Sequence, residues 1–407
     1  MQVRKAAIEC IRRILHESVK ADVAMQQAAQ YFEIRERKLL HEYVYGVLRY
    51  CYSLEADFSR FCKSKPDPDV YAALAIGTYQ QRHMRVPTHA AVSATVAAMQ
   101  QLNPKAAGFV NAVLRRVSEH EAPAKLKPNQ RAELPRWMYA VWRDAFGADV
   151  VQDFCQVLKQ PPKLCLAVFV DRQDWMTQVQ AMGIEAEAGG LSPFAVLLPV
   201  GSDVTALPGF DAGQFTVMDQ AAQAAVMALD LPTSCDGVIL DICAAPGGKT
   251  ALLAHRFAHA RIIAIELNAK RMPRLQENLS RLHCDHVEVL QADAIDLPFA
   301  ANSVDAIVLD APCSASGILR RHPDAKFLQD QNAVEKLSGL QLEMLNASLR
   351  ILKADAAMLY AVCSIHPQEN EQVLMALHHT KALQMQRLFP AVDHDGFFYA
   401  SIKKAAA

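Results

Sequence analysis

The sequence lacks the features that mark membrane, secreted and disulfide-bonded proteins. Its 407 residues contain no apolar run of about 18, the length that a transmembrane helix needs. Charges are scattered through residues 1–20, where a secretory signal would be apolar. Ten cysteines are present, but no two are spaced as C-x-x-C, so zinc-binding spacing is absent. We therefore expect a cytoplasmic protein with reduced thiols, without a membrane segment or a metal site.

Aromatic residues are also scarce, at 7% of the chain, and their positions indicate no stacking platform for nucleic-acid bases. Hydrophobic residues make up 52% and charged residues 21%, which excludes a mainly disordered or collagen-like chain. Residues 1–150 carry a net charge of +7 and the remainder −8. A basic front half is typical of a polyanion-binding module, although a solvated surface without a partner fits the charge equally well.

The first part of the chain has the pattern of amphipathic helices. In residues 3–15, apolar side chains recur at the spacing of one helix face, at positions 3, 7, 8, 11, 14 and 15. Similar stretches cover 36–50, 71–79, 90–100 and 109–117, and prolines separate several of them. We predict an all-α bundle over residues 1–125.

The remaining chain mixes strands and helices. Residues 126–232 begin in a polar, proline-containing stretch and continue with apolar runs at 164–170 and 195–200, which predicts a linker and a small α/β bridging subdomain. Over residues 233–407, apolar strands alternate with helices. The strands are expected at 237–241, 261–266, 287–290, 304–310 and 357–362. This predicts an α/β domain with a doubly wound, mostly parallel sheet that binds ligands at the carboxyl ends of its strands.

A glycine-containing turn, DICAAPGGKT at 241–250, follows the first of these strands. Its small residues let the backbone approach a ligand at a helix N-terminus. The turn lacks the G-x-G-x-x-G fingerprint, which disfavours a nicotinamide oxidoreductase. Glu266 ends the next strand, where an acid can accept both hydroxyls of a ribose, and Asp293 follows the third strand, placed to receive an adenine amino group. Each feature alone is also explained as a tight turn or a helix cap, but together they favour a nucleoside-bearing cofactor.

Two cysteines follow the next two strands, Cys313 in DAPCS and Cys363 in YAVCS. Strand ends of a doubly wound sheet can be neighbours on the ligand side, so we expect both cysteines and Asp310 around one pocket. A lone cysteine at a strand end is more often buried packing. The inference therefore depends on the pair, on the adjoining acid and on the cofactor site beside them.

Such a pocket suits methylation of cytosine at C5. That carbon is a poor nucleophile, but a thiolate that adds to C6 converts the ring into an enamine that can attack an electrophilic methyl group. The reaction also needs an acid near N3 and a base that removes the C5 proton before the thiol leaves. Asp310 is the candidate acid, and spacing alone does not say which cysteine is the nucleophile.

Four stretches resemble the Sun-family RNA cytosine-C5 methyltransferases, most closely the RsmB/Fmu type that acts on 16S ribosomal RNA. They are 241–250, 310–323 (DAPCSASGILRRHP), 360–370 (YAVCSIHPQEN) and 395–399 (DGFFY). Two N-terminal stretches, RERKLLHEYVYGVLRY and KAAGFVNAVLRRV, resemble the NusB-like helical RNA-binding domain of that type. The chain differs from the family pattern at Val362, where threonine is usual, and at Glu266, where aspartate is frequent. The family's Leu-Arg-x-Asn is also missing after Pro161 and Pro162.

The resemblance implies a NusB-like bundle, a Rossmann-like methyltransferase core and S-adenosylmethionine as cofactor. It implies that Cys363 is the nucleophile, that Cys313 resolves the covalent adduct, and that Asp310 lies near the cytosine and the methionine end of the cofactor. The cofactor-binding residues that it implies are Cys243, Ala244, Ala245, Pro246, Gly247, Gly248, Lys249, Glu266, Asp293 and Asp310.

RNA is the implied partner, in particular small-subunit ribosomal RNA, and the chain gives no sign of an obligate protein partner. Arg320, Arg321 and His322 are candidates for contacts with RNA phosphates, and a solvated charged turn is the alternative. Two alternatives stay open for the whole protein, a transfer-RNA cytosine-C5 methyltransferase and a non-catalytic RNA-binding or ribosome-assembly factor. An amino-group methyltransferase is disfavoured, because residues 310–313 read Asp-Ala-Pro-Cys instead of Asp/Asn-Pro-Pro-aromatic.

Overall fold

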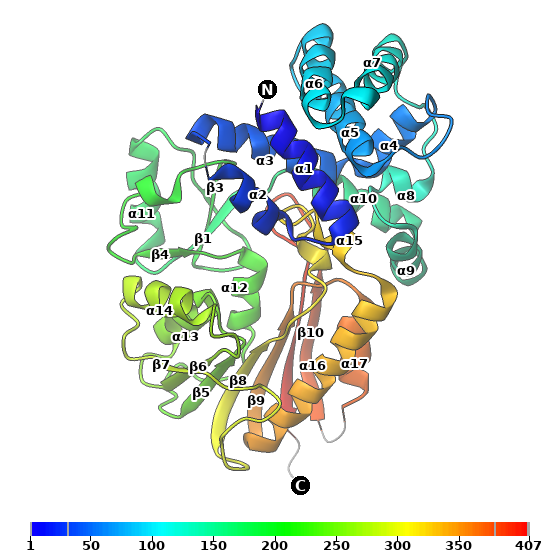
Figure 1. Cartoon of the computed structure of the whole chain (residues 1–407). Helices are drawn as coiled ribbons and strands as arrows, with labels where there is room; N and C mark the ends of the chain where they lie inside the picture. Colours follow the sequence, from blue (N-terminus) through cyan, green and yellow to red (C-terminus); the bar gives the residue numbers. More distant parts are fainter. Residues whose placement is uncertain (1, 31, 378–379, 405–407) are drawn as a thin grey trace. The chain divides into compact units, whose positions relative to one another are not determined.

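The computed structural model describes residues 2–30, 32–377 and 380–404, and the chain divides into two compact units (Figure 1). The first unit comprises residues up to Gln160 together with Leu319–Gln331, and the second comprises Pro161–Ile318 and the residues from Asn332 onward. The division at 1–125, 126–232 and 233–407 stays a prediction. The segment 319–331 lies inside the predicted catalytic domain in sequence, yet it belongs to the helical unit in space.

The first unit is a bundle of helices around α5. Residues Val70–Gln80 of α5 are all buried, and α1, α3, α4, α6 and α7 contact this helix. Helix α5 begins with Pro68 in its first turn, where a missing N–H costs nothing. The helices are α1 (Gln2–Glu17), α2 (Ala21–Ala29), α3 (Ile34–Arg49), α4 (Cys51–Ser59), α5 (Pro68–His83), α6 (Thr88–Leu102), α7 (Pro104–Glu119), α8 (Pro128–Arg131), α9 (Arg136–Phe146), α10 (Ala148–Leu158) and α15 (Ala325–Leu328).

The polar stretch at the start of 126–232, which we predicted as a linker, is tied to this bundle. The buried Glu133 carboxylate accepts a hydrogen bond from the backbone N–H of Tyr52 at the start of α4, at 2.9 Å. This bond satisfies one of the free N–H groups that every helix start leaves. Farther along, Trp142 of α9 packs against Phe154 of α10, with ring centroids 5.4 Å apart. A single buried acid therefore converts a polar stretch into part of the helical unit.

The second unit contains a small antiparallel sheet with the strand order β2-β3-β1-β4. Its elements are β1 (Leu164–Val168), α11 (Arg172–Ala181), β2 (Glu187–Ala188), β3 (Ala195–Leu198) and β4 (Phe215–Val217). The apolar runs that predicted strands at 164–170 and 195–200 correspond to β1 and β3. Trp175 of α11 is buried against this sheet, and its indole N–H donates to the carbonyl of Pro208 at 2.9 Å.

The main sheet of the second unit has seven strands in the order β10-β11-β9-β8-β5-β6-β7. Strands β9, β8, β5, β6 and β7 are parallel, and β11 runs antiparallel to both β9 and β10. The five predicted strands are the five parallel ones, and the two C-terminal strands were not predicted. The elements are α12 (Gln220–Met227), β5 (Val238–Ile242), α13 (Gly248–Arg256), β6 (Arg261–Ile265), α14 (Met272–Arg281), β7 (Glu288–Leu290), β8 (Val304–Asp310), α16 (Gln331–Ile351), β9 (Leu352–Val362), α17 (Glu371–Met375), β10 (Thr380–Leu388) and β11 (Phe397–Lys404).

Helices cover both faces of this sheet, with α12, α13 and α14 on one side and α16 and α17 on the other (Figure 1). Alternate residues of one strand serve the two cores, since Ile239 packs with the first group and Leu240 with the second. Burial on both faces explains why the strands read as continuous apolar runs. The prediction of a doubly wound, mostly parallel α/β sheet and of a separate helical bundle is confirmed.

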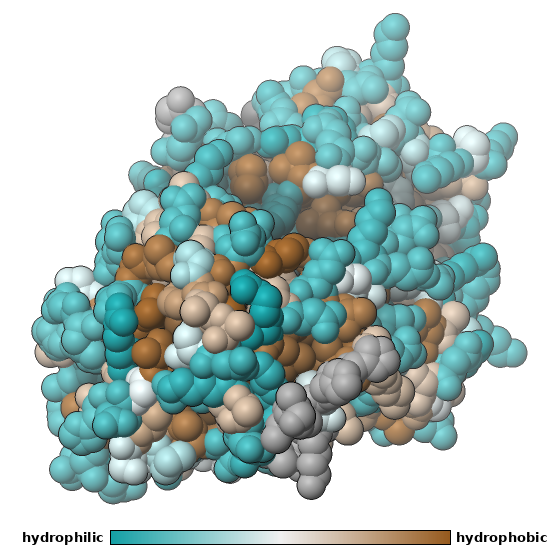
Figure 2. All heavy atoms as spheres, turned by 90° about the horizontal axis from the view of Figure 1, so that it is seen from below, coloured by the Kyte–Doolittle hydropathy of each residue, from teal (hydrophilic) through white to brown (hydrophobic). Residues whose placement is uncertain are grey.

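The exposed surface says less about where a ligand binds than the strand order of the sheet does. Figure 2 shows a face on which hydrophilic residues predominate and apolar residues form several patches between them. No described helix is long and apolar enough to cross a membrane. Within the same described residues, no group of three or more His, Cys, Asp or Glu side chains is arranged to hold a metal ion. Apolar exposure alone therefore does not single out a binding face.

Candidate active site

The candidate site lies where the parallel strands β8 and β9 end side by side. Asp310, the last residue of β8, is paired with Ala361 of β9. The backbone N–H of Ala311 then donates to the carbonyl of Ala361 at 3.0 Å, so the two chains leave the sheet together. Cys313 and Cys363 both follow within a few residues of this pair. The register therefore brings the two cysteine loops to one edge of the sheet, as predicted from strand order.

The two cysteine sulfurs are neighbours, with Sγ atoms 3.4 Å apart. Both cysteines are free and partly exposed. The hydrogen bond with Cys363 raises the pKa of Cys313 well above its ordinary value, and burial and the charges of Cys363 and Glu369 act in the same direction. Cys313 is therefore a thiol at neutral pH, and its S–H group can donate to the sulfur of Cys363.

An ion pair lies beside the cysteines. The Lys249 ammonium, from the start of α13, is 2.7 Å from the Asp310 carboxylate at the end of β8. It also lies 5.6 Å from the ring centroid of Phe397. Burial lowers the pKa of Lys249, but the charge and hydrogen bond of Asp310, with smaller effects of Asp241 and Cys363, outweigh burial and raise it overall. Lys249 is therefore a cation, and it fixes the orientation of the Asp310 carboxylate.

The loop between β5 and α13 has the backbone form of a ligand-binding turn. Gly247 has φ +99°, and a Cβ atom there would meet Leu275 Cδ1 at 2.9 Å, so glycine is required. Cys243 also has a positive φ of 65°. The fully buried Asp241 accepts a hydrogen bond from the Thr250 hydroxyl at 2.5 Å through Oδ2, while its Oδ1 has no partner among the described residues. A buried carboxylate oxygen without a partner fits a ligand that brings positive charge or a hydrogen-bond donor.

Glu266 directly follows β6 and is almost fully buried. Its Oε1 accepts a hydrogen bond from the backbone N–H of Asn268 at 2.9 Å, and its Oε2 lies 3.0 Å from the Arg271 guanidinium. Arg271 also donates to the carbonyl of Ala245 in the loop after β5. The carboxylate is therefore held in place next to the loop. Asp293 is exposed three residues after β7, where it accepts from the backbone N–H of Ile295 at 3.0 Å.

The three residues that we predicted to contact RNA lie in the segment 319–331, which belongs to the helical unit. Arg320 is only 2% exposed, and its carbonyl accepts a hydrogen bond from Arg49 at 3.0 Å. A buried guanidinium is not available to an RNA phosphate at the surface, which argues against a phosphate contact by Arg320. Arg321 is half-buried and His322 is exposed, so they remain the accessible candidates.

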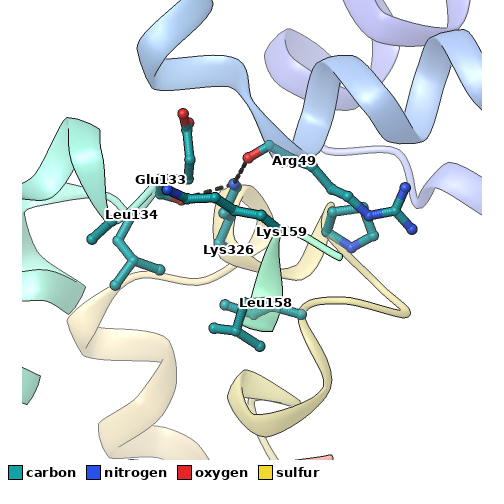
Figure 3. Close-up of a pocket in the computed structure, with 9 residues that line it drawn as sticks. Arg49, Glu133, Leu134, Leu158, Lys159 and Lys326 are labelled. Atoms are coloured by element: carbon teal, nitrogen blue, oxygen red, sulfur yellow. Dashed lines mark hydrogen bonds between the residues drawn. The ribbon is translucent and has the colours of Figure 1, made fainter. Parts of the chain in front are cut away.

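The same segment is anchored by two further charged side chains. Asp324 accepts a hydrogen bond from the first backbone N–H of α2, at Ala21, at 3.0 Å. Lys326 reaches between the carbonyls of Glu133 and Arg49, at 2.8 and 3.3 Å (Figure 3). The cavity around it measures about 10 Å³, room for roughly one water molecule. Hydrogen bonds of buried side chains thus hold the segment 319–331 in the helical unit.

Two residues that the sequence analysis did not single out contribute to the site. Arg271 links Glu266 to the loop after β5, and the buried Glu369 contacts the residues after both cysteines. Glu369 stands in YAVCSIHPQEN, six residues after Cys363, so its place in a quoted motif was the available signal. Spacing could not reveal that its carboxylate turns back toward the strand ends.

Known protein families match the chain in three consecutive parts. Residues 1–119 match the NusB family, and residues 134–205 match a ferredoxin-like domain of RsmF/B-like methyltransferases. Residues 226–403 match the family described as 16S rRNA methyltransferase RsmB/F.

Proteins from several bacteria match over the full length of the chain. The Ribosomal RNA small subunit methyltransferase B of Vibrio vulnificus (strain YJ016) is 34% identical over 431 residues, covering 100% of both chains. The chain belongs to the RsmB/F methyltransferase family. The protein of the same name from Shewanella oneidensis is 33% identical, again over 100% of both chains.

Solved structures show the same fold as this RsmB/F family member. The structure titled PH0851 superposes with a TM-score of 0.81 at 22% identity, covering 99% of this chain and 98% of that one. NSun6 from Pyrococcus horikoshii, solved with SFG, gives a TM-score of 0.60 at 19% identity, covering 67% and 99%. The predictions of the family, of the fold class and of S-adenosylmethionine as cofactor are confirmed.

The residues of the site fit that cofactor. S-adenosylmethionine carries a sulfonium and an ammonium group, and carboxylates surround the loop between β5 and α13, with the free oxygen of Asp241 among them. Asp241, Glu266 and the backbone of the loop would hold the cofactor, with Asp293 nearer the rim. The role of each individual residue stays a prediction.

The buried carboxyl of Asp241 predicts a pH dependence of stability. Burial raises its pKa to about 7, against the smaller opposing effects of Thr250 and Lys249. The pKa of Asp in an unfolded chain is about 3.9, so the folded protein holds a proton that the unfolded chain releases. The free energy of unfolding should therefore fall as pH rises from about 4 to 7, by up to about 1.4 kcal/mol per pH unit from this residue.

Urea unfolding of the cofactor-free wild type and of Asp241→Asn at several pH values measures this term. The variant should show a flatter dependence, because asparagine does not titrate. The exposed Asp236→Asn is the matched control and should leave the slope unchanged. Equal slopes for the wild type and Asp241→Asn would contradict the prediction.

Proposed function

We propose that the protein methylates C5 of a cytosine in small-subunit ribosomal RNA, using S-adenosylmethionine and a covalent bond between Cys363 and C6. The observation that carries the proposal is the pair of sulfurs, 3.4 Å apart, beside the ion pair of Asp310 and Lys249. The names of the relatives, which refer to ribosomal RNA of the small subunit, support the choice of RNA. Two adjacent thiols have no evident use in methylation of an amino group, which would need no covalent bond to the base.

The reaction begins when the Cys363 sulfur adds to C6 of the cytosine. The thiol proton passes through the Asp310 carboxylate to N3, so C6 becomes tetrahedral, an enamine forms across C4 and C5, and the ring gains no net charge. Lys249 holds Asp310 in the orientation for this transfer, at 2.7 Å. S-adenosylmethionine, when bound, supplies the methyl group that C5 receives. The target base has to leave its stack to reach Cys363.

Release requires that a base, in the simplest case a water molecule, takes the C5 proton. The electron pair of that bond restores the double bond between C5 and C6, and the bond between C6 and the Cys363 sulfur breaks. We assign this last event to Cys313, because its thiol can donate a hydrogen bond to the departing sulfur at 3.4 Å. The raised pKa of Cys313 keeps that proton on its sulfur until it is needed. This division of roles agrees with the family resemblance, which assigns nucleophile and resolving cysteine in the same way.

Replacing the nucleophile should abolish methyl transfer. Cys363→Ala removes the sulfur that activates C5, so incorporation of tritiated methyl into 5-methylcytidine of unmodified small-subunit RNA should fall by at least about 10⁴-fold. Nucleoside digestion and chromatography of the labelled RNA measure the product. Cys235→Ala, a partly exposed cysteine whose sulfur contacts Gly237 N–H, is the control and should retain activity. Normal turnover by Cys363→Ala would overturn the assignment.

Replacing the resolving cysteine should instead trap the enzyme on RNA. In Cys313→Ala the bond to C6 still forms, but the departing sulfur loses its hydrogen-bond donor. A protein–RNA species that survives denaturation should accumulate on gels, and it should be absent in the double variant that also carries Cys363→Ala. An absence of any such species in Cys313→Ala, with normal turnover, would remove Cys313 from the release step.

A further inference from the structure

Glu369 is a fully buried acid that no step of the proposed reaction uses. It ends a short 3₁₀ turn, η3 (Pro367–Glu369), that follows the loop of Cys363. No basic side chain is paired with its carboxylate among the described residues, so hydrogen bonds are what compensate its burial. A buried acid of this kind is costly to keep and therefore calls for a physical explanation.

The carboxylate of Glu369 accepts four hydrogen bonds. Oε1 accepts from the backbone N–H of Ser314 at 2.8 Å and from the side-chain amide of Gln341 at 3.2 Å. Oε2 accepts from the hydroxyls of Ser314 and Ser364, both at 2.5 Å. Four donors are about the full capacity of a carboxylate. Burial raises the pKa of Glu369, and the hydrogen bonds from Ser314, Ser364 and Gln341 oppose this rise because they favour the ionised form.

The two serines are the residues directly after the two cysteines. Ser314 follows Cys313, and Ser364 follows Cys363, so one carboxylate is bonded to both cysteine loops. The two serine hydroxyls also lie 3.3 Å from each other. Across the same pair of loops, the sulfurs are 3.4 Å apart. We call Glu369, Ser314 and Ser364 the Glu369 clamp. In each of the two loops, the clamp holds the residue directly after the cysteine.

The carboxylate is itself fixed by neighbours on the sheet and on α16. Gln341 of α16 donates to the carbonyl of Pro312 at 2.9 Å as well as to Glu369. The phenol of Tyr360, on β9, donates to the backbone carbonyl of Glu369 at 2.7 Å. These contacts connect the clamp to α16 and β9. The clamp therefore has a rigid frame against which it can hold the loops.

We propose that Glu369 is a positioning residue that sets the separation of the Cys313 and Cys363 sulfurs. The inference rests on the proposed function, in which both thiols act on one cytosine. Without the clamp, each loop keeps its cysteine, but the sulfurs sample a wider range of separations. Because attack and release both depend on placement, small displacements cost large factors in rate.

The separation of the sulfurs can be measured without RNA. The purified wild type, Glu369→Ala and Glu369→Gln are equilibrated with mixtures of reduced and oxidised glutathione. Forming the Cys313–Cys363 disulfide transfers two electrons and two protons to oxidised glutathione, which becomes two reduced molecules. After acid quenching, peptide mass spectrometry gives the disulfide fraction and hence the effective concentration of one thiol at the other. Glu343→Ala, an exposed acid on α16, is the matched control.

Glu369→Ala should lower this effective concentration by about tenfold or more, whereas Glu343→Ala should leave it unchanged. Glu369→Gln keeps the shape of the side chain and one acceptor oxygen, so its effective concentration should lie between those of the wild type and Glu369→Ala. In single-turnover assays with RNA, the methyl-transfer rate of Glu369→Ala should fall by about 100-fold. The KM for S-adenosylmethionine should stay within about twofold, because the clamp does not touch the loop after β5. If Glu369→Ala fails to fold, Ser364→Ala, which removes one bond of the clamp, replaces it with a smaller expected change.

An unchanged effective concentration in a folded Glu369→Ala or Ser364→Ala protein would overturn the positioning role. A general loss of stability would instead raise the KM for the cofactor together with the loss of rate. The two proposals fail separately. If the wild type forms no 5-methylcytidine while Glu369→Ala still separates the sulfurs, the proposed function is wrong and the positioning role stands. If the wild type forms 5-methylcytidine and Glu369→Ala matches it in both readouts, the positioning role is wrong.

Discussion

The parallel pairing of β8 with β9 is the constraint on which the rest of the site depends. Because Asp310 is paired with Ala361, β8 and β9 end at the same edge of the sheet. The loops that follow the two strands therefore lie side by side. That register brings two sulfurs to 3.4 Å although 50 residues separate them in sequence. A slip of one residue in a strand would turn each following side chain to the other face of the sheet. Helices on both faces oppose such a slip, because alternate residues along the strands are buried in two separate cores.

The charges around this edge divide into two groups with different tasks. Asp241 and Glu266 line the loop after β5, which we predict to hold the cofactor, and Asp241 keeps one buried oxygen without a partner among the described residues. Asp310 and Lys249 form an ion pair beside the cysteines, where the proposed reaction places the target base. Glu369 belongs to neither group, because its carboxylate is used up by four donors from the protein itself. Its charge therefore acts on geometry and on the Cys313 thiol, not on a ligand.

The sequence predicted those parts of the structure that repeat with a period or end a strand. Apolar periodicity predicted the bundle and the five parallel strands, and strand order predicted that Asp310, Cys313 and Cys363 would meet. The sequence did not predict β10 and β11. These strands form an antiparallel hairpin next to β9, and the alternation of strands and helices that predicted the parallel strands is absent there. The burial of Arg320 could not be predicted from the sequence, because a basic turn is usually exposed. Only the structure shows that the segment 319–331 packs in the helical unit. Glu369 was missed for a related reason, because the direction of a side chain after a turn depends on tertiary contacts.

In the proposed reaction the Cys363 sulfur, and not that of Cys313, bonds to the cytosine ring. Small-subunit RNA carrying 5-fluorocytidine tests it most directly, because fluorine at C5 cannot leave as a proton and the bond to sulfur persists. The wild-type protein is incubated with this RNA and S-adenosylmethionine, digested with protease and nuclease, and analysed by tandem mass spectrometry. We expect one modified peptide, with the nucleotide on Cys363. A nucleotide on Cys313, or no covalent peptide under conditions in which unmodified RNA is methylated, would contradict it.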